Sequence, residues 1–520
     1  MNANKILWAD DEIDLLKPHI MFLTARGYDL TTVNNGRDAI DLVADGNHFD
    51  LIILDENMPG LTGLETLQQL KMMAPTTPII MITKSEEENI MDQAVGNNIA
   101  DYLIKPVNPN QILLSIKKNL HGGTLVARQA TADYQQQFQA IAGEIATAST
   151  LTDWMALYDK IVKWELKLTQ ADTDMAPMLE MQRREAEGEF FKFVKANYAS
   201  WLQGDAVDRP LMSDTLMQRV VLPQLDAMTD DSAPLYFLLI DNFRLDQWQT
   251  VKPLLSEYFT FEEQLYTTIL PTATQYARNA IFSGLMPGRI AKMFPDLWVD
   301  EDEEEGKNLN ESPMVETLLQ RFRRQCRFSY NKIYDSQGCD RMLKGLSNLK
   351  GNKLNIIVIN FIDMLSHART ESKMIRELAS NDPAYRSITE SWFRHSSILD
   401  LFKAIAAQGS RIIVTTDHGT IRVDRPVKII GDKNTNTNLR YKIGRSLNYQ
   451  AKQVMEIKDP EAVGLPRPNV ASAYVLAGRD DFFAYPNNYN YYVQYYTGTF
   501  QHGGVSMEEM LVPLVTLSPK

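Results

Sequence analysis

The fold of the first part of the chain is decided by residues 51–63, LIILDENMPGLTG. Four apolar residues that end at Asp55 are typical of a strand covered by helices on both faces. Similar apolar runs occur at 6–8, 79–82 and 102–104, with amphipathic stretches between them. This alternation predicts a doubly wound α/β domain.

Five polar side chains stand at the ends of these strands. They are Asp10, Asp11, Asp55, Thr83 and Lys105. Ligands of such sheets bind beyond the carboxyl ends of the strands, so we expect all five on one edge. Carboxylates suit Mg²⁺, and the backbone carbonyl of Asn57 is a further expected ligand. Asp55 is the expected nucleophile, Lys105 a fixed cation for phosphoryl oxygens, and Thr83 a hydroxyl that hydrogen-bonds them.

This pattern closely resembles the response-regulator receiver family. It has the acidic pair, the D-x-x-M-P-G-x-x-G run from Asp55 to Gly63, Thr83 after a strand, and Lys105 before a proline. The resemblance implies a flavodoxin-like fold, phosphorylation of Asp55 by a sensor histidine kinase, and a homodimer that forms on phosphorylation. It also implies that Tyr102 is the switch aromatic that this family often has.

The next part of the chain has helical spacing. Aromatic and aliphatic residues recur three and four positions apart at 134–145, 154–168 and 190–201. This spacing predicts three amphipathic helices. We expect a central three-helix bundle over residues 122–205, with the aromatic side chains in its core.

The α/β pattern then returns on a larger scale. Buried-strand runs occur at 235–240, 354–361, 411–416, 471–476 and 511–517. The predicted domains are therefore a receiver at 1–121, the helical bundle at 122–205 and a large α/β domain at 206–520.

Carboxylates and histidines gather at strand ends in this large domain. The six candidate metal ligands are Asp241, Asp363, His367, Asp417, His418 and His502. Carboxylate and imidazole donors suit Zn²⁺ or Mn²⁺, and such a set is too large for one tetrahedral ion. We expect two ions about 4 Å apart, which can clamp both the attacking and the leaving oxygen of a phosphoryl displacement.

A hydroxyl nucleophile is expected in the stretch PTATQYAR at 271–278. Thr274 stands where a predicted helix running to Gly284 begins, and the N-terminus of a helix favours an anion. Thr272 is the second candidate.

The nucleophile and the ligands, in this order, resemble the alkaline phosphatase superfamily. Thr274 has the spacing to Ser283-Gly284 that this family keeps, whereas Thr272 does not. Arg278 stands where related sulfatases have an arginine that contacts the phosphate or sulfate.

The same resemblance divides the metal ligands into two groups. One ion would be bound by Asp363, His367 and His502. The other would be bound by Asp241, Asp417 and His418, together with Thr274. The segments DNFR, PTATQYARNAIFSG and VTTDHG resemble the PglZ branch of the superfamily. A receiver, a helical bundle and a PglZ domain in one chain resemble response regulators that are linked to type IX protein secretion.

Composition excludes several functional classes. The net charge of −13 is the opposite of what a protein needs to coat DNA, so no sequence-specific DNA binding is expected. No uncharged apolar run reaches about 18 residues, so no membrane span is expected. Only Cys326 and Cys339 are present and the N-terminus does not resemble a signal peptide, so we expect a cytoplasmic protein.

These features predict a response regulator whose output is a two-zinc phosphohydrolase. Several phosphodiesterases of the superfamily use a Thr nucleophile, so nucleotide or oligonucleotide phosphodiesters are the expected substrates. Basic side chains that could hold a nucleotide are Arg321, Arg323, Arg324, Arg327, Arg440, Lys442 and Arg445. The alternative is a phosphorylation-gated dimer or interaction module, with structural metals, that binds a regulatory partner.

Overall fold

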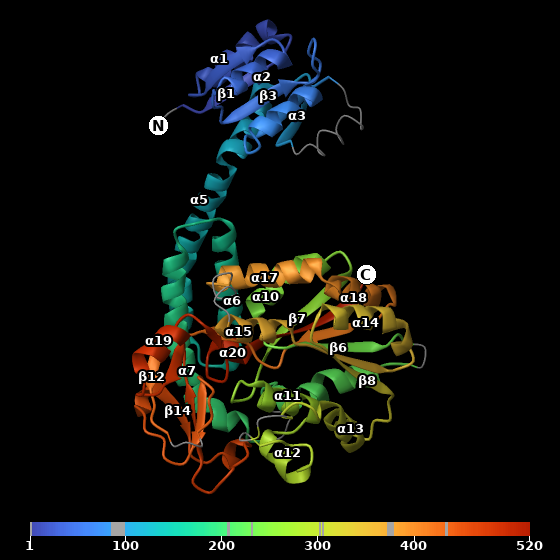
Figure 1. Ribbon diagram of the computed structural model, residues 1–520, viewed down its shortest axis with the longest axis vertical. Coiled ribbons are helices and arrows are strands. Elements are labelled where there is room, and N and C mark those ends of the chain that lie inside the picture. The colour runs from blue at the N-terminus through green and yellow to red at the C-terminus, as the bar shows by residue number, and fades with distance from the viewer. Residues whose placement is uncertain are drawn as a thin grey trace. The chain divides into compact units, whose positions relative to one another are not determined.

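The computed structural model of the chain is drawn in Figure 1, from the N-terminus in blue to the C-terminus in red. The residues it describes are 3–84, 99–204, 209–229, 232–300, 303, 306–371, 379–431 and 435–520. They form two compact units, one of Met1–Asp133 with Gln170–Asp174 and one of Tyr134–Thr169 with Met175–Lys520. None of the described helices is both long and apolar enough to cross a membrane.

The first unit contains a parallel sheet with the strand order β2-β1-β3-β4-β5. Its strands are β1 (Lys5–Ala9), β2 (Asp29–Val33), β3 (Leu51–Asp55), β4 (Ile79–Thr83) and β5 (Asp101–Ile104). Neighbouring residues of one strand pack into opposite cores: Leu7 and Leu54 lie in one, Trp8 and Ile53 in the other. Both faces are therefore buried, which is why the strands are continuous apolar runs. The predicted doubly wound domain is confirmed.

Three helices follow the first three strands of this unit, and two of them have clear start signals in the sequence. They are α1 (Lys17–Thr24), α2 (Gly36–Ala44) and α3 (Gly63–Met73). The Asn35 side chain caps α2, and Thr62 and Glu65 form a capping box at the start of α3. A Cβ atom at Gly63 would lie 2.5 Å from the backbone oxygen of Asp55, so only glycine lets α3 begin so close to the strand end.

Three long helices form the helical linker. They are α5 (Pro109–Thr147), α6 (Leu151–Gln170) and α7 (Ala176–Trp201). The ring centroids of Tyr134 and Trp164 are 5.5 Å apart, as are those of Trp154 and Phe190, and the Tyr134 hydroxyl donates to Gln182 at 2.8 Å. The expected helical linker with an aromatic core is thus present. Helix α5 is continuous through residue 121, and the domain limits at 121 and 205 stay predictions.

The C-terminal domain is built on a mixed sheet with the order β7-β18-β10-β6-β9-β8. Its strands are β6 (Leu235–Ile240), β7 (Phe259–Thr267), β8 (Phe328–Ile333), β9 (Leu354–Ile359), β10 (Ile412–Thr415) and β18 (Leu511–Pro519). Strands β10, β6, β9 and β8 are parallel neighbours, whereas β18 is antiparallel to both β10 and β7. The predicted α/β class is confirmed.

Helices cover both faces of this sheet. Figure 1 shows α11 and α13 on one face and α10, α14, α17 and α18 on the other. The described helices of the whole C-terminal domain are α8 (Ser213–Leu216), α9 (Leu222–Asp226), α10 (Leu245–Leu255), α11 (Thr274–Ser283), α12 (Pro287–Met293), α13 (Glu311–Arg321), α14 (Ser336–Gly345), α15 (Phe361–Glu371), α17 (Asp382–His395), α18 (Ser397–Ala407), α19 (Tyr489–Tyr496) and α20 (Met507–Met510).

Smaller sheets complete the domain. They pair β11 (Ile421–Arg422) with β17 (Phe500–Gln501), β12 (Arg425–Lys428) with β16 (Asp481–Ala484), and β15 (Ala473–Ala477) with β13 (Tyr441–Gly444) and β14 (Val454–Ile457). The first of these pairs joins the segment that follows β10 to the segment that leads into His502.

Strand direction places the candidate ligands. Strands β6, β9 and β10 are parallel, so the segments that follow them start at the same edge of the sheet. Strand β7 runs the same way as β10, because both are antiparallel to β18. The segment after β7, which leads to Thr274, therefore begins at that edge as well.

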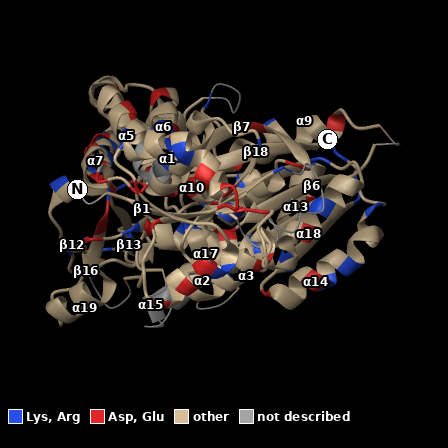
Figure 2. Ribbon diagram, turned by 90° about the horizontal axis from the view of Figure 1, so that it is seen from above, with Lys and Arg blue, Asp and Glu red and all other residues tan. Residues whose placement is uncertain are grey.

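Charged residues are mixed over the helices. Figure 2 shows Lys and Arg close to Asp and Glu on the same helices, for example on α14. This distribution differs from the one-sided basic stripe of proteins that track nucleic-acid phosphates.

The helical linker yields a stability prediction. Trp154 is 1% exposed and its ring packs on Phe190 and Phe193. We expect Trp154→Ala to lower the free energy of unfolding by about 3 to 5 kcal/mol, because it leaves a cavity. Urea unfolding followed by far-ultraviolet circular dichroism measures this. The control Met178→Ala, at a position 39% exposed on α7, should cost less than about 1 kcal/mol; equal costs would contradict the prediction.

Candidate functional site

The acidic residues of the receiver meet at the carboxyl edge of its sheet. Asp10, Asp11 and Asp55 each offer an oxygen, and these atoms lie within 4.8 Å of one another. Lys105 Nζ lies 2.9 Å from Asp10 Oδ2 and 2.8 Å from Asp55 Oδ1. Burial raises the pKa of Asp55, and Lys105 opposes this rise. Carboxylate oxygens gathered in this way fit a hard divalent cation such as Mg²⁺.

The other predicted receiver residues lie around this group. Thr83 is fully buried at the end of β4. Tyr102 is partly buried on β5 and packs against one of the two cores of the sheet. Asn57 is exposed in the turn that follows β3. Residues 85–98, which follow Thr83 and Lys84, lie outside the described part of the chain.

A buried group of candidate metal ligands in the C-terminal domain consists of Asp241, Asp417 and His418. Their ligand atoms lie within 4.8 Å of one another, and all three residues are at most 1% exposed. The guanidinium of Arg278 lies between the two carboxylates: it forms an ion pair with Asp241, and its Nε lies 2.9 Å from Asp417 Oδ2. Helix α11 therefore supplies a cation to this group.

The electrostatics of this group favour a further cation. Burial raises the pKa of Asp241 well above its usual range, although Arg278 opposes this effect. Burial also acts to raise the pKa of Asp417, but Arg278 and His418 outweigh it and bring this pKa down to about 2. Oδ1 of Asp241 is buried without a hydrogen-bond partner among the described residues. This donor set fits a divalent metal ion, which would offset the carboxylate repulsion.

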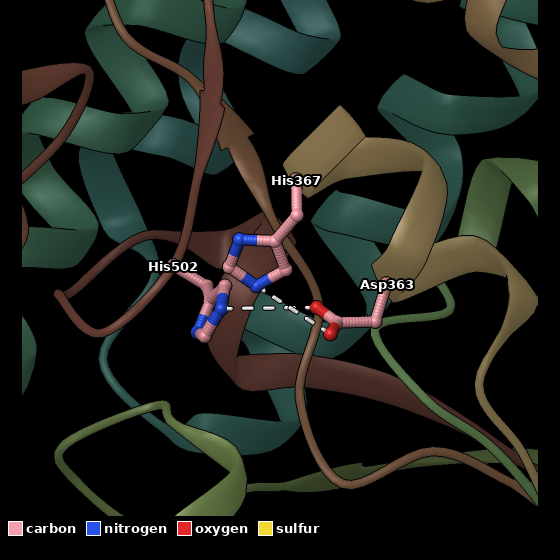
Figure 3. Close-up of side chains that lie close together, drawn as sticks. All are labelled: Asp363, His367 and His502. Atoms are coloured by element: carbon pink, nitrogen blue, oxygen red, sulfur yellow. Dashed lines mark ion pairs between the residues drawn. The ribbon is translucent and has the colours of Figure 1, made fainter. Parts of the chain in front are cut away.

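A second group of candidate ligands consists of Asp363, His367 and His502, and the atoms they offer also lie within 4.8 Å of one another. Asp363 and His367 are on helix α15, whereas His502 follows β17. Figure 3 shows both imidazoles beside the Asp363 carboxylate, at 3.5 Å for His367 Nε2 and 3.9 Å for His502 Nε2. The His367 side chain is 63% exposed, so this group is the more open to solvent.

Backbone carbonyls orient two of the histidine rings. Nδ1–H of His418 donates to the Gly419 oxygen and Nδ1–H of His502 to the Thr272 oxygen, both at 3.1 Å, since a carbonyl can only accept. In a neutral ring this hydrogen bond leaves Nε2 as the lone-pair atom, the arrangement of metal-binding histidines. The rings stack at 4.2 Å, which joins the two ligand groups. Burial lowers the pKa of His502 well below its usual range, so its imidazole is neutral.

The two threonine candidates have different surroundings. Thr274 is the first residue of α11. Its hydroxyl lies 3.1 Å from Nε2 of His418, which belongs to the first ligand group. Thr272 is fully buried, and its hydroxyl donates to the Gly504 oxygen and accepts from Gly503 N–H, both at 2.9 Å. Of the two hydroxyls, only that of Thr274 faces a candidate ligand.

The glycine of the Asp-His-Gly motif is explained by a close backbone contact. A Cβ atom at Gly419 would lie 2.0 Å from the backbone oxygen of Glu508 on α20. Gly419 N–H also donates to the Glu509 oxygen at 3.1 Å. The segment that carries His418 is thus fixed against α20.

Two neighbours of the site were not predicted from the sequence. Glu311 is fully buried, lies 3.7 Å from Arg278, and also pairs with Lys332. Asn242 has φ of 61°, and its amide donates to Asp363 at 3.3 Å. Asn242 follows Asp241 directly, and asparagine tolerates positive φ. Its position in the sequence could therefore have indicated a tight turn at the end of β6. Glu311 has no local signal, because it reaches the site only through the fold.

Two of the basic residues expected to hold a nucleotide are instead internal. Arg440 is fully buried and pairs with Glu509 at 2.5 Å. Lys442 is 1% exposed, and its Nζ donates to the Asn436 oxygen at 2.8 Å. Neither side chain is available to a substrate, so the expectation is wrong for both. The error arises because a basic residue between apolar ones gives no sign of a buried partner far along the chain.

Three protein-family models match the chain in succession. A response regulator receiver domain matches residues 6–117, a PorX response regulator linker domain matches 124–202, and the BREX system PglZ alkaline phosphatase-like domain matches 216–517. Because the last match covers more than half of the 520 residues, the chain belongs to the PglZ alkaline phosphatase-like family. With the receiver and the linker before this domain, it is a PorX-like response regulator, and a receiver implies a cognate histidine kinase.

Curated relatives match over shorter stretches. The transcriptional regulatory protein ResD of Bacillus subtilis is 36% identical over 116 residues, which is 22% of this chain and 48% of ResD. The alginate biosynthesis transcriptional regulatory protein AlgB of Pseudomonas syringae pv. tomato is 31% identical over 144 residues, 28% of this chain and 30% of AlgB. The chain thus spans about half or less of these relatives.

A similar solved structure is that of the chemotaxis protein CheY4 of Vibrio cholerae. It is 31% identical, covers 23% of this chain and 99% of its own, and has a TM-score of 0.22.

Metal binding at the second ligand group can be tested with His502→Ala. We expect at least about tenfold weaker Zn²⁺ binding, because this change removes one of the three donors. Loss of a residue that merely hydrogen-bonds to a metal ligand already lowers metal affinity by about tenfold or more. Metal analysis after dialysis against buffered Zn²⁺ measures the change. The control His395→Ala, at an exposed histidine at the end of α17, should bind as the unsubstituted protein does. Identical zinc binding by both variants would contradict the assignment.

Proposed function

We propose that the protein is a phosphorylation-controlled phosphodiesterase, in which Asp55 receives the signal and Thr274 is the nucleophile of the output domain. The main support is the position of the Thr274 hydroxyl, 3.1 Å from His418 Nε2, where two groups of metal ligands adjoin. The alkaline phosphatase-like family supports a phosphohydrolase.

The two ligand groups are proposed to hold zinc. Asp241, Asp417 and His418 would hold one ion and Asp363, His367 and His502 the other, as mixed carboxylate and imidazole donors favour. Bound there, two divalent ions would stabilise the negative charge on the attacking and leaving oxygens of the phosphoryl group.

Thr274 is proposed to form a covalent intermediate. Its Oγ1 attacks phosphorus, the ester oxygen leaves with the bonding electron pair, and the Oγ1 proton passes to solvent. Water then cleaves the phosphothreonine and restores the hydroxyl. Thr274 is the first residue of α11, so the N–H groups of the first helical turn face the phosphoryl oxygens.

Arg278 is proposed to contact the transferred phosphoryl group. It is one turn after Thr274 on α11, so both side chains lie on one face of the helix. In this structure Asp241 and Asp417 form ion pairs with its guanidinium. A metal ion would offset the negative charge of these carboxylates and weaken their ion pairs with Arg278, so that the guanidinium could contact the phosphoryl group.

The substrate class and the biological setting are further proposals. A threonine nucleophile supports phosphodiesters of nucleotides or oligonucleotides, as in related phosphodiesterases of the superfamily. The resemblance to PorX, through the linker match at 124–202, supports a link to type IX protein secretion.

The nucleophile is tested by Thr274→Ala. We expect hydrolysis of bis-p-nitrophenyl phosphate and of a short oligonucleotide, with Zn²⁺ or Mn²⁺, to fall by about a hundredfold or more, because the covalent step is lost. Thr274→Ser should keep part of the activity. The control Thr497→Ala, at an exposed threonine after α19, should hydrolyse both substrates at the original rate.

The same measurement separates enzyme from scaffold. A module that only binds a regulatory partner through structural metals would not depend on the Thr274 hydroxyl. Equal hydrolysis by Thr274→Ala and the unsubstituted chain would remove the catalytic assignment and favour that alternative.

Asp55 is proposed to control a dimer. With Mg²⁺ bound by Asp10, Asp11 and Asp55, and with Lys105 beside the acceptor, phosphate on Asp55 would be read by Thr83 and Tyr102 and let two receivers pair.

Receiver control is tested by Asp55→Asn. Light scattering coupled to gel filtration, with acetyl phosphate and Mg²⁺, should show a dimer for the unsubstituted chain and a monomer for this variant, because the acceptor is lost. Asp50→Asn is the matched control, since Asp50 precedes the same strand and is exposed. A dimer that persists in Asp55→Asn would refute receiver control.

A further inference from the structure

A cluster of buried and partly buried ion pairs lies next to the two ligand groups without belonging to them. Its members are Glu165, Arg183, Arg244, Asp246, Asp382, Arg386 and Glu508, which we call the linker cluster. Two of them come from linker helices and five from the C-terminal domain, so the cluster connects the two.

Arg244 is the centre of this cluster. It is 2% exposed and precedes helix α10. Its Nε and one terminal nitrogen bond both oxygens of Asp246, at 2.9 and 2.5 Å, and its other terminal nitrogen lies 2.7 Å from Asp382 Oδ1. A planar guanidinium held at three nitrogens has a fixed orientation.

Arg244 touches the segments that carry the first ligand group. It is the third residue after Asp241, on the turn that leaves β6. Its guanidinium lies 3.5 Å from the backbone oxygen of Thr420, two residues beyond His418. The turn after Asp241 therefore carries Arg244, and the turn after His418 contacts the same side chain.

The same guanidinium reaches the second ligand group through two aromatic rings. It lies 5.4 Å from the ring centre of Phe500, two residues before His502, and 5.7 Å from that of Tyr385. These rings stack at 4.4 Å, and the Tyr385 hydroxyl donates to the oxygen of Ile362, the residue before Asp363. Arg244 thus contacts three of the four ligand-bearing segments directly and the fourth, that of Asp363, through Tyr385.

Helix α6 contacts this centre through an ion pair. Glu165 Oε1 lies 2.5 Å from a terminal nitrogen of Arg386, and that nitrogen lies 3.0 Å from Asp246 Oδ2. Asp246 holds Arg244, so a chain of three short contacts leads from α6 to the centre of the cluster.

Helix α7 contacts it by a second route. Arg183 lies 2.9 Å from Glu508 Oε1 on α20 and 3.9 Å from Asp382 Oδ2. A cavity of about 160 Å³, lined partly by Glu165, Leu168, Arg183 and Asp382, lies at this junction. The ion pairs of Glu165 and Arg183 border this cavity and join α6 and α7 to the C-terminal domain.

We infer that Arg244 is a positioning residue for the metal centre and that α6 and α7 act on the ligand groups through the linker cluster. This inference rests on the metal-dependent function proposed above. Buried ion pairs are often no more stabilising than apolar packing, but each one specifies a distance and a direction. A shift of α6 or α7 therefore moves Arg244, which contacts three of the ligand-bearing segments directly and the fourth through Tyr385.

The experiment uses the full chain with Co²⁺, whose visible absorption reports ligand geometry. The variants are Glu165→Gln, Arg183→Gln and Arg244→Lys. The matched controls are Asp159→Asn, in an exposed ion pair with Lys163 on α6, and Arg184→Gln, beside Arg183 on α7 with its side chain 56% exposed. We expect the three variants to bind Co²⁺ about tenfold more weakly, with altered absorption, and the controls to be unchanged.

Hydrogen exchange of the metal-free chain provides a readout that needs no metal. In Glu165→Gln we expect faster exchange at 241–244 and 418–420, although the substitution is on α6. Co²⁺ binding, absorption and exchange identical to those of the controls would overturn the inference and leave the proposed function intact. If the unsubstituted chain binds no Co²⁺, the proposed function fails. The exchange result then decides whether α6 acts on these segments. If Arg244→Lys does not fold, the two linker variants still decide the question.

Discussion

Buried carboxylates crowd the carboxyl edges of both large sheets, and the arrangement of the sites depends on how their repulsion is balanced. In the receiver, Lys105 lies within 2.9 Å of both Asp10 and Asp55. In the C-terminal domain, Arg278 lies between Asp241 and Asp417. Parallel strands create this crowding because their carboxyl ends share one edge. One monovalent side chain offsets only part of the charge, so each edge favours a divalent ion as well.

In the C-terminal domain, backbone hydrogen bonds and one ion pair fix the loops that carry His418 and His502. Carbonyl oxygens accept from Nδ1 of His418 and His502, which leaves Nε2 of each ring for a ligand. Glu509 accepts from Gly504 N–H at 2.9 Å and pairs with the buried Arg440. The loop after His502 is therefore fastened to the small β13-β15-β14 sheet. Precise placement here comes from many backbone contacts and not from one strong bond.

The sequence predicted the fold classes well because their signals are local. The apolar run at 51–54 needs only its own residues to indicate a strand buried on both faces, and the start of α11 at Thr274 follows from a helical pattern that ends at Gly284. The positions of Arg440 and Glu311 could not be predicted. Their burial depends on partners 69 and 33 residues away, and nothing in the intervening sequence specifies such a contact.

The sequence by itself determined the order of the domains, the family resemblance, and which carboxylates and histidines are candidate ligands, because motif order and periodicity are properties of the chain. Only the tertiary structure decided that Arg278 lies between Asp241 and Asp417, that Thr274 and not Thr272 faces His418, and that Arg244 links the ligand segments to the linker helices. These contacts join strand ends and helices that are distant in sequence, and only the sheet order and the helix packing bring them together.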